Sequence, residues 1–325
     1  MINKAILLVG GKGTRLAPLT NNVPKPMLRI AGRPVTEHQI AKARSAGITE
    51  IILATSYLAE VFEPYFGDGS AFGVKLRYAV ETEPLGTGGA IAHAADQFAL
   101  QKDESFFVFN GDVLSGHDLR AQSELHFRSG ADVTLHLTKV DDARAYGCVP
   151  IDAQGRVSEF LEKMENPKAN SINAGCYIFS YHALSTIPRS TVVSVERETF
   201  PQLLASQRQI FGYEDSRYWI DMGTPKAMIQ ASRDLIMNPE ISSATPSIHN
   251  GAIIEEGAIV SPEAMVSEGS FLESGSSIGA RTIVRGSIIT SGASIEEDVT
   301  IKNSYIAPGT RVASGSIIED QVFGF

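Results

Sequence analysis

The chain has 325 residues, a formal net charge of −9 at pH 7, 43% hydrophobic residues and 20% charged residues. A chain of this length usually forms more than one core, so we expect two domains with the composition of a globular protein. The acidic balance, with no basic run, predicts no nucleic-acid partner. No apolar run reaches the ~18 residues of a membrane span, which predicts no membrane partner and a cytoplasmic location.

The first strand is followed directly by a glycine-rich loop. Ala5–Val9 is a short continuous apolar run, typical of a strand buried on both faces of a parallel sheet. Gly10, Gly11 and Gly13 come next, and glycines let successive backbone N–H groups approach an anion closely. A glycine loop after a strand can equally be a simple tight turn, so the neighbouring residues decide between the two readings.

Two cations near this loop favour a phosphate site. Arg15 carries a planar guanidinium fork that suits phosphate oxygens, and Lys25 stands between Pro24 and Pro26 on a stiff segment. The pattern fits neither the dinucleotide fingerprint, which needs a third glycine at Leu16, nor the P-loop, which needs Gly-Lys-Ser/Thr. The segment therefore predicts a triphosphate cradle of a different kind.

Up to about Asn238, strands and helices alternate, which predicts a mixed, mostly parallel α/β sheet. The expected helices are Pro34–Ala46, Tyr57–Phe66, Gly88–Phe98, Leu119–Ser129 and Thr224–Met237, and the expected strands after the first are Ile48–Ala54, Lys75–Val80, Phe106–Asn110 and Ala131–Val140. Short strands dominate from Gly147 to Tyr177. Cys148 and Cys176 lie in apolar stretches without a CxxC pair, so we expect two core residues and no disulfide or zinc site.

Past a polar linker at 239–247 the sequence changes to a period of six. Aliphatic residues recur at Ile248, Ile254, Val260, Val266, Leu272, Ile278 and Val284, and again, after five-residue units, at Ile289, Ile295, Ile301, Ile306, Val312 and Ile318. Hexapeptide repeats of this form predict a left-handed parallel β-helix with the aliphatic side chains pointing inward. We therefore expect domains at 1–238 and 248–325, with a homo-oligomer (dimer or tetramer) formed through the β-helix.

Several of these segments together resemble the sugar-1-phosphate nucleotidylyltransferases, over essentially the whole chain. The resemblance rests on Gly10-Gly11-x-Gly13-Thr14-Arg15-Leu16-x-Pro18-Leu19-Thr20 and on Pro24-Lys25-Pro26-Met27-Leu28, and the later segments look closest to the mannose-1-phosphate guanylyltransferases. The resemblance implies a Rossmann-like nucleotidyltransferase domain and the reaction of GTP with mannose 1-phosphate to GDP-mannose and pyrophosphate. It also implies catalytic roles for Arg15, Lys25 and Asp112.

The resemblance further implies a set of nucleotide and metal contacts. The nucleotide would be bound by Gly10, Gly11, Gly13, Thr14, Arg15, Lys25, Glu81, Gly86 and Thr87. Asp112, after a buried strand, and Asp221, in Trp219-Ile220-Asp221, would hold Mg²⁺, with Mn²⁺ as the alternative, since two carboxylates with phosphate oxygens and waters suit this ion. Either aspartate could instead be an ordinary turn or helix-cap residue.

The bases and the sugar are addressed by separate segments. An ionised Glu81 is acceptor-only, so it can receive both N–H groups of the guanine edge, whereas a solvated acidic loop is the plainer interpretation of Glu81–Glu83. By resemblance, the sugar phosphate would contact Asn110, Gly147, Glu162, Lys163, Asn173 and Trp219. The usual proline after Glu-Lys is replaced by Met164, which puts the local loop path in question.

Three alternatives remain open from the sequence. Within the same class, glucose 1-phosphate or another sugar-like 1-phosphate could be the acceptor. A non-catalytic regulatory subunit is disfavoured by the intact Arg15, Lys25, Asp112 and Asp221. An acyltransferase β-helix is disfavoured because the repeats contain only His249, at their very start.

Overall fold

The computed structural model describes residues 2–144, 146–161 and 165–325. They form two compact units that do not follow chain order. The first comprises Met1–Lys12 and Gln39–Trp219, and the second Gly13–His38 and Ile220–Phe325. Among the described residues no helix is both long and apolar enough to cross a membrane.

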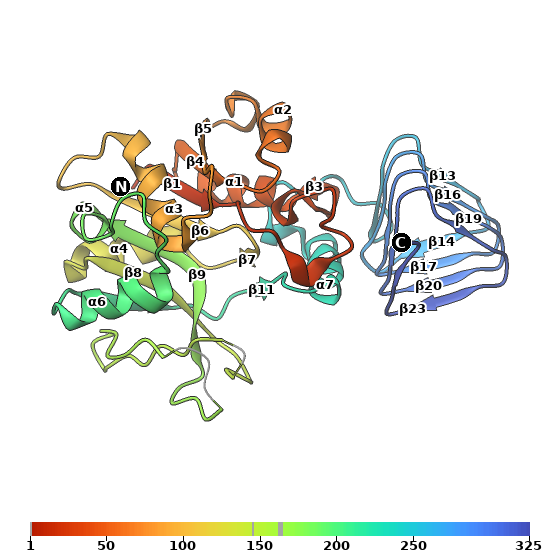
Figure 1. The fold of residues 1–325 in the computed structure, drawn as a ribbon. Coiled ribbons are helices and arrows are strands. Elements are labelled where there is room, and N and C mark those ends of the chain that lie inside the picture. The colour runs from red at the N-terminus through yellow and green to blue at the C-terminus, as the bar shows by residue number, and fades with distance from the viewer. Residues whose placement is uncertain (1, 145, 162–164) are drawn as a thin grey trace. The chain divides into compact units, whose positions relative to one another are not determined.

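The first unit is built on a seven-stranded sheet with the order β10-β8-β9-β6-β1-β4-β5 (Figure 1). Its strands are β1 (Lys4–Leu8), β4 (Glu50–Thr55), β5 (Lys75–Val80), β6 (Ser105–Asn110), β8 (Val133–Lys139), β9 (Ser171–Ser180) and β10 (Ile210–Glu214). β6, β1, β4 and β5 run parallel, whereas β9 is antiparallel to both β6 and β8. The mixed, mostly parallel sheet predicted from the alternating pattern is confirmed.

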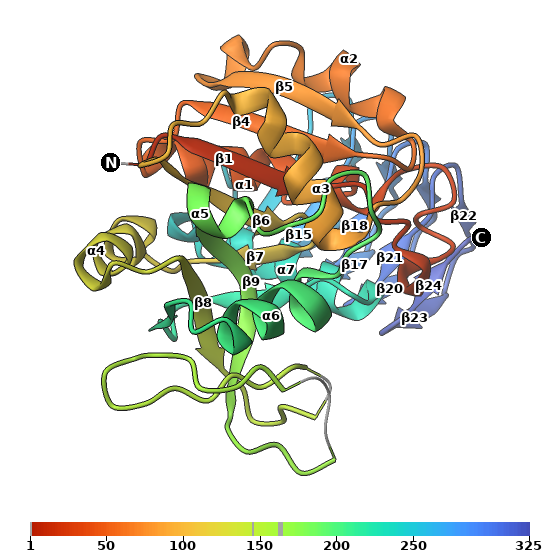
Figure 2. The same cartoon turned by 60° about the vertical axis from the view of Figure 1, so that its left-hand side comes forward.

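Helices cover this sheet. They are α1 (Val35–Ser45), α2 (Phe62–Phe66), α3 (Gly86–Ala95), α4 (Leu119–Ser129), α5 (Tyr181–Leu184) and α6 (Phe200–Ala205), with a π-helix η6 at Val195–Thr199. α3 packs on β1 and β4, as Figure 2 shows, and α4 packs on β8 and β10. The free thiols of Cys148 and Cys176 are buried in the core as predicted.

Helix ends follow local signals in one case and fail in another. α4 begins after Asp118, whose carboxylate accepts from Arg120 N and Ala121 N at 2.9 and 3.1 Å, and it ends at Gly130 in the left-handed conformation. The helix predicted over Tyr57–Phe66 is wrong in its first half. Leu58 has a φ of +51°, which no α-helix accommodates, so a 3₁₀ turn precedes α2.

The second unit joins two distant parts of the sequence. The first part holds the 3₁₀ turns η1 (Thr14–Leu16) and η2 (Lys25–Met27) and the small strands β2 (Arg29–Ile30) and β3 (Arg33–Pro34). The second part begins after β11 (Trp219–Asp221) with helix α7 (Pro225–Met237), is followed by the turn η7 (Pro239–Ile241), and continues into the β-helix. The hydroxyl of Thr224 caps α7 by accepting from Ala227 N at 3.2 Å.

The hexapeptide region forms short parallel strands in three stacked sheets, which confirms the parallel β-helix (Figure 1). The sheets comprise β12 (Ala252–Ile254), β15 (Ser270–Leu272), β18 (Ile288–Ile289), β21 (Tyr305–Ile306) and β24 (Val322–Phe323); β13 (Ile259–Val260), β16 (Ser277–Ile278), β19 (Ser294–Ile295) and β22 (Arg311–Val312); and β14 (Met265–Ser267), β17 (Ile283–Arg285), β20 (Thr300–Lys302) and β23 (Ile317–Glu319). Ile259 pairs with Ser277, and Ser277 with Ser294. The first coil thus takes three hexapeptides, and the next is one residue shorter because of a five-residue unit.

The predicted inward aliphatic column is buried along most of the β-helix but not at its start. Leu272, Ile289 and Ile306 are fully buried, whereas Ile254 is 39% exposed. Ile254 occupies the same register as Leu272, but its strand, β12, is the end strand of its sheet among the described residues, so its side chain is not covered by a preceding coil. Ile254 therefore keeps the register of the inward column but is left partly exposed at the end of the stack.

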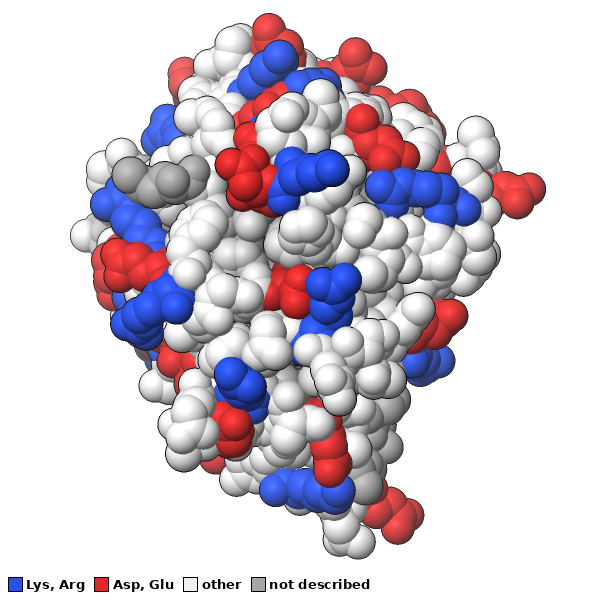
Figure 3. Space-filling model, turned by 90° about the vertical axis from the view of Figure 1, so that its left-hand side faces the viewer, with Lys and Arg blue, Asp and Glu red and all other residues white. Residues whose placement is uncertain are grey.

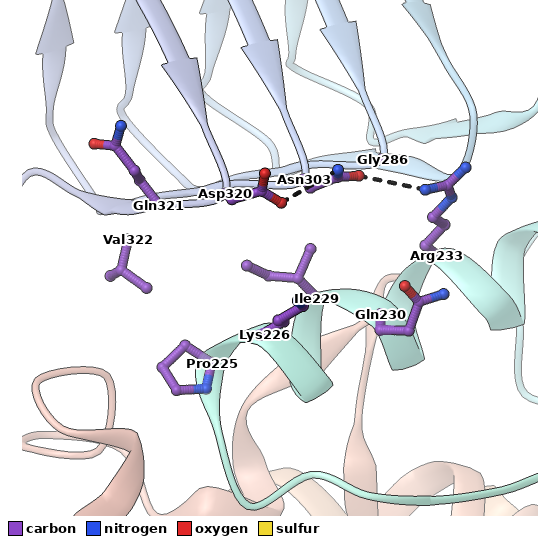
Figure 4. Close-up of a pocket in the computed structure, with 10 residues that line it drawn as sticks. All are labelled: Pro225, Lys226, Ile229, Gln230, Arg233, Gly286, Asn303, Asp320, Gln321 and Val322. Carbon is purple, nitrogen blue, oxygen red and sulfur yellow. Dashed lines mark hydrogen bonds between the residues drawn. The ribbon is translucent and has the colours of Figure 1, made fainter.

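A pocket of about 300 Å³ lies in the second unit between α7 and the turns of the β-helix (Figure 4). Lys226 and Ile229 of α7 line one side, and Asn303 lines the other, where its amide oxygen accepts from Arg233 Nη1 at 3.3 Å. Further along α7 the helix backbone lies directly against the β-helix, because a Cβ on Gly269 would lie only 2.9 Å from Arg233 Cα. The closest packing between α7 and the β-helix is therefore at the second half of α7.

Candidate active site

Several of the predicted site residues in the first unit lie at the carboxyl ends of three parallel strands. Gly10 follows β1, Glu81 follows β5, and Asp112 follows β6 after Asn110. Gly111 N donates to Leu8 O at 3.0 Å, which ties the loop after β6 to the end of β1. In open α/β sheets this edge is where ligands bind, so the structure brings these residues to the expected place.

The glycines of this edge differ in what requires them. A Cβ on Gly10 would lie 2.7 Å from Ser56 Oγ, and one on Gly111 would lie 2.5 Å from Leu8 O, so packing demands glycine at both. A Cβ on Gly11 would meet no described atom within 4 Å. Packing therefore does not explain Gly11, and this position leaves space for a ligand to lie against the backbone.

Glu81 is half-buried beside the start of α3. Its Oε2 accepts from Leu85 N at 3.2 Å, and burial raises the pKa of the carboxyl above its ordinary value, opposed by this N–H donor. Its Oε1 accepts no hydrogen bond from the described residues. A half-buried acceptor at the end of β5 fits an edge-on contact with a base.

The loop that carries Asp112 is held by a residue that the sequence analysis missed. Gln39, buried in α1, donates through Nε2 to Asn110 O and to Val113 O, both at 2.8 Å. These carbonyls flank Gly111 and Asp112, so one amide group fixes both ends of the loop. Nothing near Gln39 in sequence signals this role, because its partners lie 71 and 74 positions away.

A cluster of polar side chains lies where β6 and β9 run side by side. Tyr177 OH accepts from Asn173 Nδ2 at 2.8 Å and from Asn110 Nδ2 at 3.5 Å, and it donates to Glu196 Oε1 at 3.4 Å. Within the described residues, Asn110 Oδ1 is buried without a hydrogen-bond partner. Gly175, with a φ of +75°, allows the close approach of Asn110, since a Cβ there would lie 3.0 Å from Asn110 Nδ2. The cluster thus offers an unsatisfied acceptor next to a carboxylate.

Thr87 and Gly86 are engaged with the chain itself. The Thr87 hydroxyl donates to Glu196 Oε2 at 3.0 Å and accepts from Val195 N at 2.8 Å. Gly86 has a φ of +69°, and a Cβ there would lie 2.5 Å from Val193 O. Thr87 therefore holds the start of the π-helix η6, which contains Glu196, and Gly86 packs against Val193 just before it. The predicted nucleotide contacts of Gly86 and Thr87 stay predictions.

Three of the residues predicted to bind the sugar phosphate lie around the start of β9. Trp219 Nε1 donates to Ala174 O at 3.0 Å, and the Trp219 ring meets the Tyr146 ring edge-on at a centroid distance of 5.6 Å. Asn173 N donates to Gly147 O at 3.4 Å. The predicted residues Glu162 and Lys163 lie outside the described residues.

The second unit holds the remaining predicted residues. Lys25 is 6% exposed in η2, and its Nζ lies 3.8 Å from Asp221 Oδ1. Gly13 stands against this lysine with a φ of +60°, and a Cβ there would lie 3.0 Å from Lys25 Cβ and 3.2 Å from Thr20 Cγ2. Glycine at position 13 is therefore required both by its backbone conformation and by the position of Lys25.

Arg15 belongs to the same group. Its guanidinium lies against Gly223, where a Cβ would be 3.0 Å from Arg15 Nη1. Gly223 stands two residues after Asp221, so the structure brings an arginine, a lysine and a carboxylate together within one unit. Thr14 opens η1 and is exposed. The need for glycine at position 223 was not anticipated from the sequence.

The donor set suits a hard cation held partly by substrate. In the described ranges, no group of three or more His, Cys, Asp or Glu side chains could hold a metal ion by itself. The predicted ligands, Asp112 of the first unit and Asp221 of the second, both carry carboxylate oxygens. Magnesium typically takes one or two carboxylates, with waters and phosphate oxygens completing its coordination. The residues therefore fit such an ion better than a soft transition metal.

On the face shown in Figure 3, lysine and arginine side chains alternate with aspartate and glutamate side chains. Among the described residues several charges are paired, such as Arg217 with Asp215 at 2.5 Å and Lys168 with Glu159 at 2.7 Å. Positive and negative side chains are therefore mixed on this face and do not form separate patches of like charge.

Comparison with known proteins identifies the sequence family. Residues 4–238 match the family model described as Nucleotidyl transferase. The chain is 49% identical over 257 residues to a mannose-1-phosphate guanylyltransferase of Mycobacterium tuberculosis, covering 77% of this chain and 71% of that protein. It is 35% identical over 260 residues to mannose-1-phosphate guanylyltransferase 1 of Arabidopsis thaliana, covering 78% and 72%.

A solved structure shares the fold. HddC from Yersinia pseudotuberculosis, crystallised in complex with GMP-PN, is 28% identical to this chain, with a TM-score of 0.61. The match covers 72% of this chain and 100% of that one. The expected Rossmann-like nucleotidyltransferase core is thus confirmed by both sequence and structure.

Proposed function

Since this chain belongs to the nucleotidyl transferase family, and is therefore a nucleotidyltransferase, we propose that it makes GDP-mannose and pyrophosphate from GTP and mannose 1-phosphate. The relatives from Mycobacterium tuberculosis and Arabidopsis thaliana, at 49% and 35% identity, carry the name of this activity. The observation that carries the proposal is the grouping of Arg15, Lys25 and Asp221, two cations and one carboxylate, in one unit.

The reaction needs positioning and charge neutralisation rather than a covalent intermediate. A phosphate oxygen of the sugar phosphate, already anionic at neutral pH, attacks the α-phosphorus in line, and the bond to pyrophosphate breaks. Backbone N–H groups at Gly10, Gly11, Gly13 and Thr14, with Arg15, bind the triphosphate. Lys25, buried and fixed by η2, stabilises the negative charge that develops at the reacting phosphates.

Asp112 and Asp221 are the proposed ligands of Mg²⁺, with Mn²⁺ as a possible substitute. When bound, the ion neutralises charge on the phosphate oxygens and so favours attack and departure. The chain's own contribution is to hold the two carboxylates. Gln39 fixes the loop of Asp112, and the Lys25 ammonium lies 3.8 Å from Asp221 Oδ1.

Base selection is assigned to Glu81. The guanine edge offers two adjacent N–H donors, N1–H and N2–H, which a carboxylate receives together. Adenine offers one donor and one acceptor, and uracil or thymine one donor between two acceptors. The half-buried position of Glu81 at the end of β5 supports this assignment.

The sugar is assigned to the cluster around Tyr177. A sugar hydroxyl would donate to the buried Asn110 Oδ1, which lacks a partner among the described residues, and the neighbouring Glu196 and Asn173 would receive further hydroxyls. Gly147 and Trp219 would close the site on the side of the β9 start. Glu162 and Lys163 keep their proposed roles toward sugar hydroxyls and phosphate, respectively.

We also propose that residues 1–238 are the catalytic domain, 239–247 the linker and 248–325 a left-handed β-helix through which the chain forms a dimer or tetramer in the cytoplasm. The repeat pattern and the three-sheet stack support the third region, and the family match at 4–238 agrees with the first.

Steady-state kinetics over a grid of substrates tests the proposal. Pyrophosphate release is measured for GTP, ATP, UTP and dTTP, each with mannose 1-phosphate and with glucose 1-phosphate. GTP with mannose 1-phosphate is expected to give the highest kcat/KM. A higher kcat/KM for another pair refutes the substrate assignment, and no release with any pair refutes the catalytic role.

A further inference from the structure

The candidate catalytic residues of the second unit continue directly into elements attached to the β-helix. Four residues after Lys25 comes Arg29, which opens β2, and four residues after Asp221 comes Pro225, which opens α7. Both β2 and α7 belong to the same compact unit as the β-helix. The relative position of Lys25 and Asp221 therefore depends on how β2 and α7 are anchored.

Arg29 anchors β2 to the first two coils of the β-helix. Its Nη2 binds Glu255 Oε1 and donates to Gly32 O at 2.8 Å, and its Nη1 lies 3.3 Å from both Glu255 Oε2 and Glu273 Oε1. The guanidinium also lies 5.3 Å from the centroid of the Phe271 ring. All five N–H groups of an arginine point outward in a fixed fork, so this set of contacts fixes the orientation of the side chain.

The two glutamates are themselves fixed by the β-helix. Glu255 Oε2 accepts from Ser274 N at 3.0 Å, and Glu273 Oε2 accepts from Ser291 N at 2.9 Å. Each carboxylate thus bridges Arg29 and a turn of the next coil. Because Glu273 is only 14% exposed in its side chain and Glu255 22%, solvent screens these pairs less than surface pairs.

α7 is attached to the same place. Ala31 N, next to β2, donates to the buried Ser232 Oγ of α7 at 2.9 Å. α7 packs on both β2 and β15, the strand that contains Phe271. The segment with Lys25, the helix that follows Asp221 and the first coils of the β-helix therefore meet at one junction.

Between Lys25 and Arg29 the chain has little freedom. Leu28 N donates to Lys25 O at 3.1 Å, and Thr36 Oγ1 donates to Pro26 O at 3.0 Å. Because these hydrogen bonds hold the intervening residues, we expect a displacement of Arg29 to move Lys25 as well.

We propose that Arg29 is a positioning residue for catalysis, and that the first two coils of the β-helix serve as a template that sets the Lys25–Asp221 geometry. This inference rests on the proposed function of Lys25 and Asp221. It gives the β-helix a role within the catalytic cycle of each single chain, separate from any role in assembly.

The test compares Arg29→Met with a matched control, Arg281→Met. Arg281 also pairs across coils, with Glu297 at 2.6 Å, Asp298 at 2.7 Å and Glu263 at 3.6 Å, and among the described residues these ion-pair partners all belong to the β-helix. Arg29→Met removes the charge and the fork and keeps most of the stem. The expected result is a fall in kcat of about tenfold or more for Arg29→Met, with KM for the nucleotide changed less than threefold, whereas Arg281→Met keeps kcat within twofold.

Hydrogen–deuterium exchange supplies the readout that does not depend on activity. Exchange over residues 24–31 should become faster in Arg29→Met and stay unchanged in Arg281→Met. A double variant, Arg29→Met with Glu255→Gln, should lose no more kcat than Arg29→Met alone, because both changes break one interaction.

Two results overturn the proposal: a folded Arg29→Met protein with kcat within twofold of wild type, or equal losses of kcat in both arginine variants. If Arg29→Met fails to fold, Arg29→Lys decides, since it keeps the charge but loses the fork and should still lower kcat at an unchanged melting temperature. All variants are assayed with the substrate pair that wild type turns over fastest. A wrong sugar or base therefore leaves this test intact, and an inactive wild type refutes the proposed function instead.

Discussion

Replacing Gly13 by alanine should reduce catalysis by moving Lys25. Gly13 has a φ of +60°, and forcing an alanine into this conformation costs about 1–2 kcal/mol of stability. The new Cβ would also lie 3.0 Å from Lys25 Cβ and 3.2 Å from Thr20 Cγ2, where carbon atoms prefer about 3.5–4.0 Å. Relief of both contacts requires Lys25 to move by roughly 0.5–1 Å.

A shift of this size at a charge-stabilising group costs up to about a hundredfold in rate, so we expect Gly13→Ala to lower kcat by about 10- to 100-fold. The matched control is Gly130→Ala. Gly130 has a φ of +62° at the end of α4, and a Cβ there would meet no described atom within 4 Å. The two variants thus share the backbone strain, and only Gly13→Ala adds the contact with Lys25.

Pyrophosphate release and thermal unfolding are measured for both variants. Each should lose about 1–2 kcal/mol of stability from backbone strain, with a further loss in Gly13→Ala from crowding, while Gly130→Ala keeps the wild-type kcat. Equal kcat values in the two variants would refute the assignment of Lys25 to the reacting phosphates.

Three further outcomes are expected. Asp112→Asn and Asp221→Asn should each lower kcat by at least about a hundredfold in a folded protein, because each removes a proposed metal ligand; activity within a few-fold of wild type at saturating Mg²⁺ argues against the metal site. Glu81→Gln should lower kcat/KM for GTP by about 10- to 100-fold and that for UTP or dTTP by less, since an amide donor then faces a guanine donor; unchanged ratios among nucleotides contradict the base assignment. Burial lowers the pKa of His126 to about 4 and of His136 to about 3, so only the unfolded chain binds protons there just below pH 6.5. The stability present above pH 6.5 should therefore decrease toward pH 4, by about 1.4 kcal/mol per pH unit for each histidine, and a flat urea-unfolding profile from pH 6.5 to 5 would disprove this.

Features set by neighbouring residues could be predicted from the sequence. The ends of α4 depend on Asp118 and Gly130, which act within one turn of the helix, and the β-helix depends on a period that repeats every six residues. The glycine loop at the end of β1 could be located because the strand and the glycines are adjacent in the chain. In each case the residues that determine the structure lie close together in the sequence, so the local sequence pattern is enough to predict it.

Features set by distant contacts could not be predicted. Arg29 meets Glu255 across 226 positions, and Thr87 meets Glu196 across 109, with no periodicity to link either pair. Sequence reasoning therefore treated the β-helix as separate from the segment with Lys25, and it missed Glu196 altogether. The partial exposure of Ile254 was not anticipated for another reason, because a repeat pattern does not show where the stack of coils ends.

The site was predicted in composition more than in arrangement. The residue pattern indicated Lys25 and the resemblance implied a role for Asp221, and the structure adds the 3.8 Å distance between them and the contact of Arg15 with Gly223. Gln39 carried no signal in the sequence, since an amide in a helix is ordinary. Its function can be recognised only in the structure, where Gln39 Nε2 lies 2.8 Å from each of the two carbonyl oxygens that flank Gly111 and Asp112.

Isotope transfer tests the central claim most directly. Mannose 1-phosphate is labelled with ¹⁸O at its three non-bridging phosphate oxygens and incubated with GTP, Mg²⁺ and the full chain. The masses of the products are then measured by mass spectrometry. Attack of the sugar phosphate on the α-phosphorus predicts GDP-mannose that keeps all three labelled oxygens and pyrophosphate that contains none. Label in the pyrophosphate, or GTP consumed without a labelled nucleotide sugar, would contradict the account.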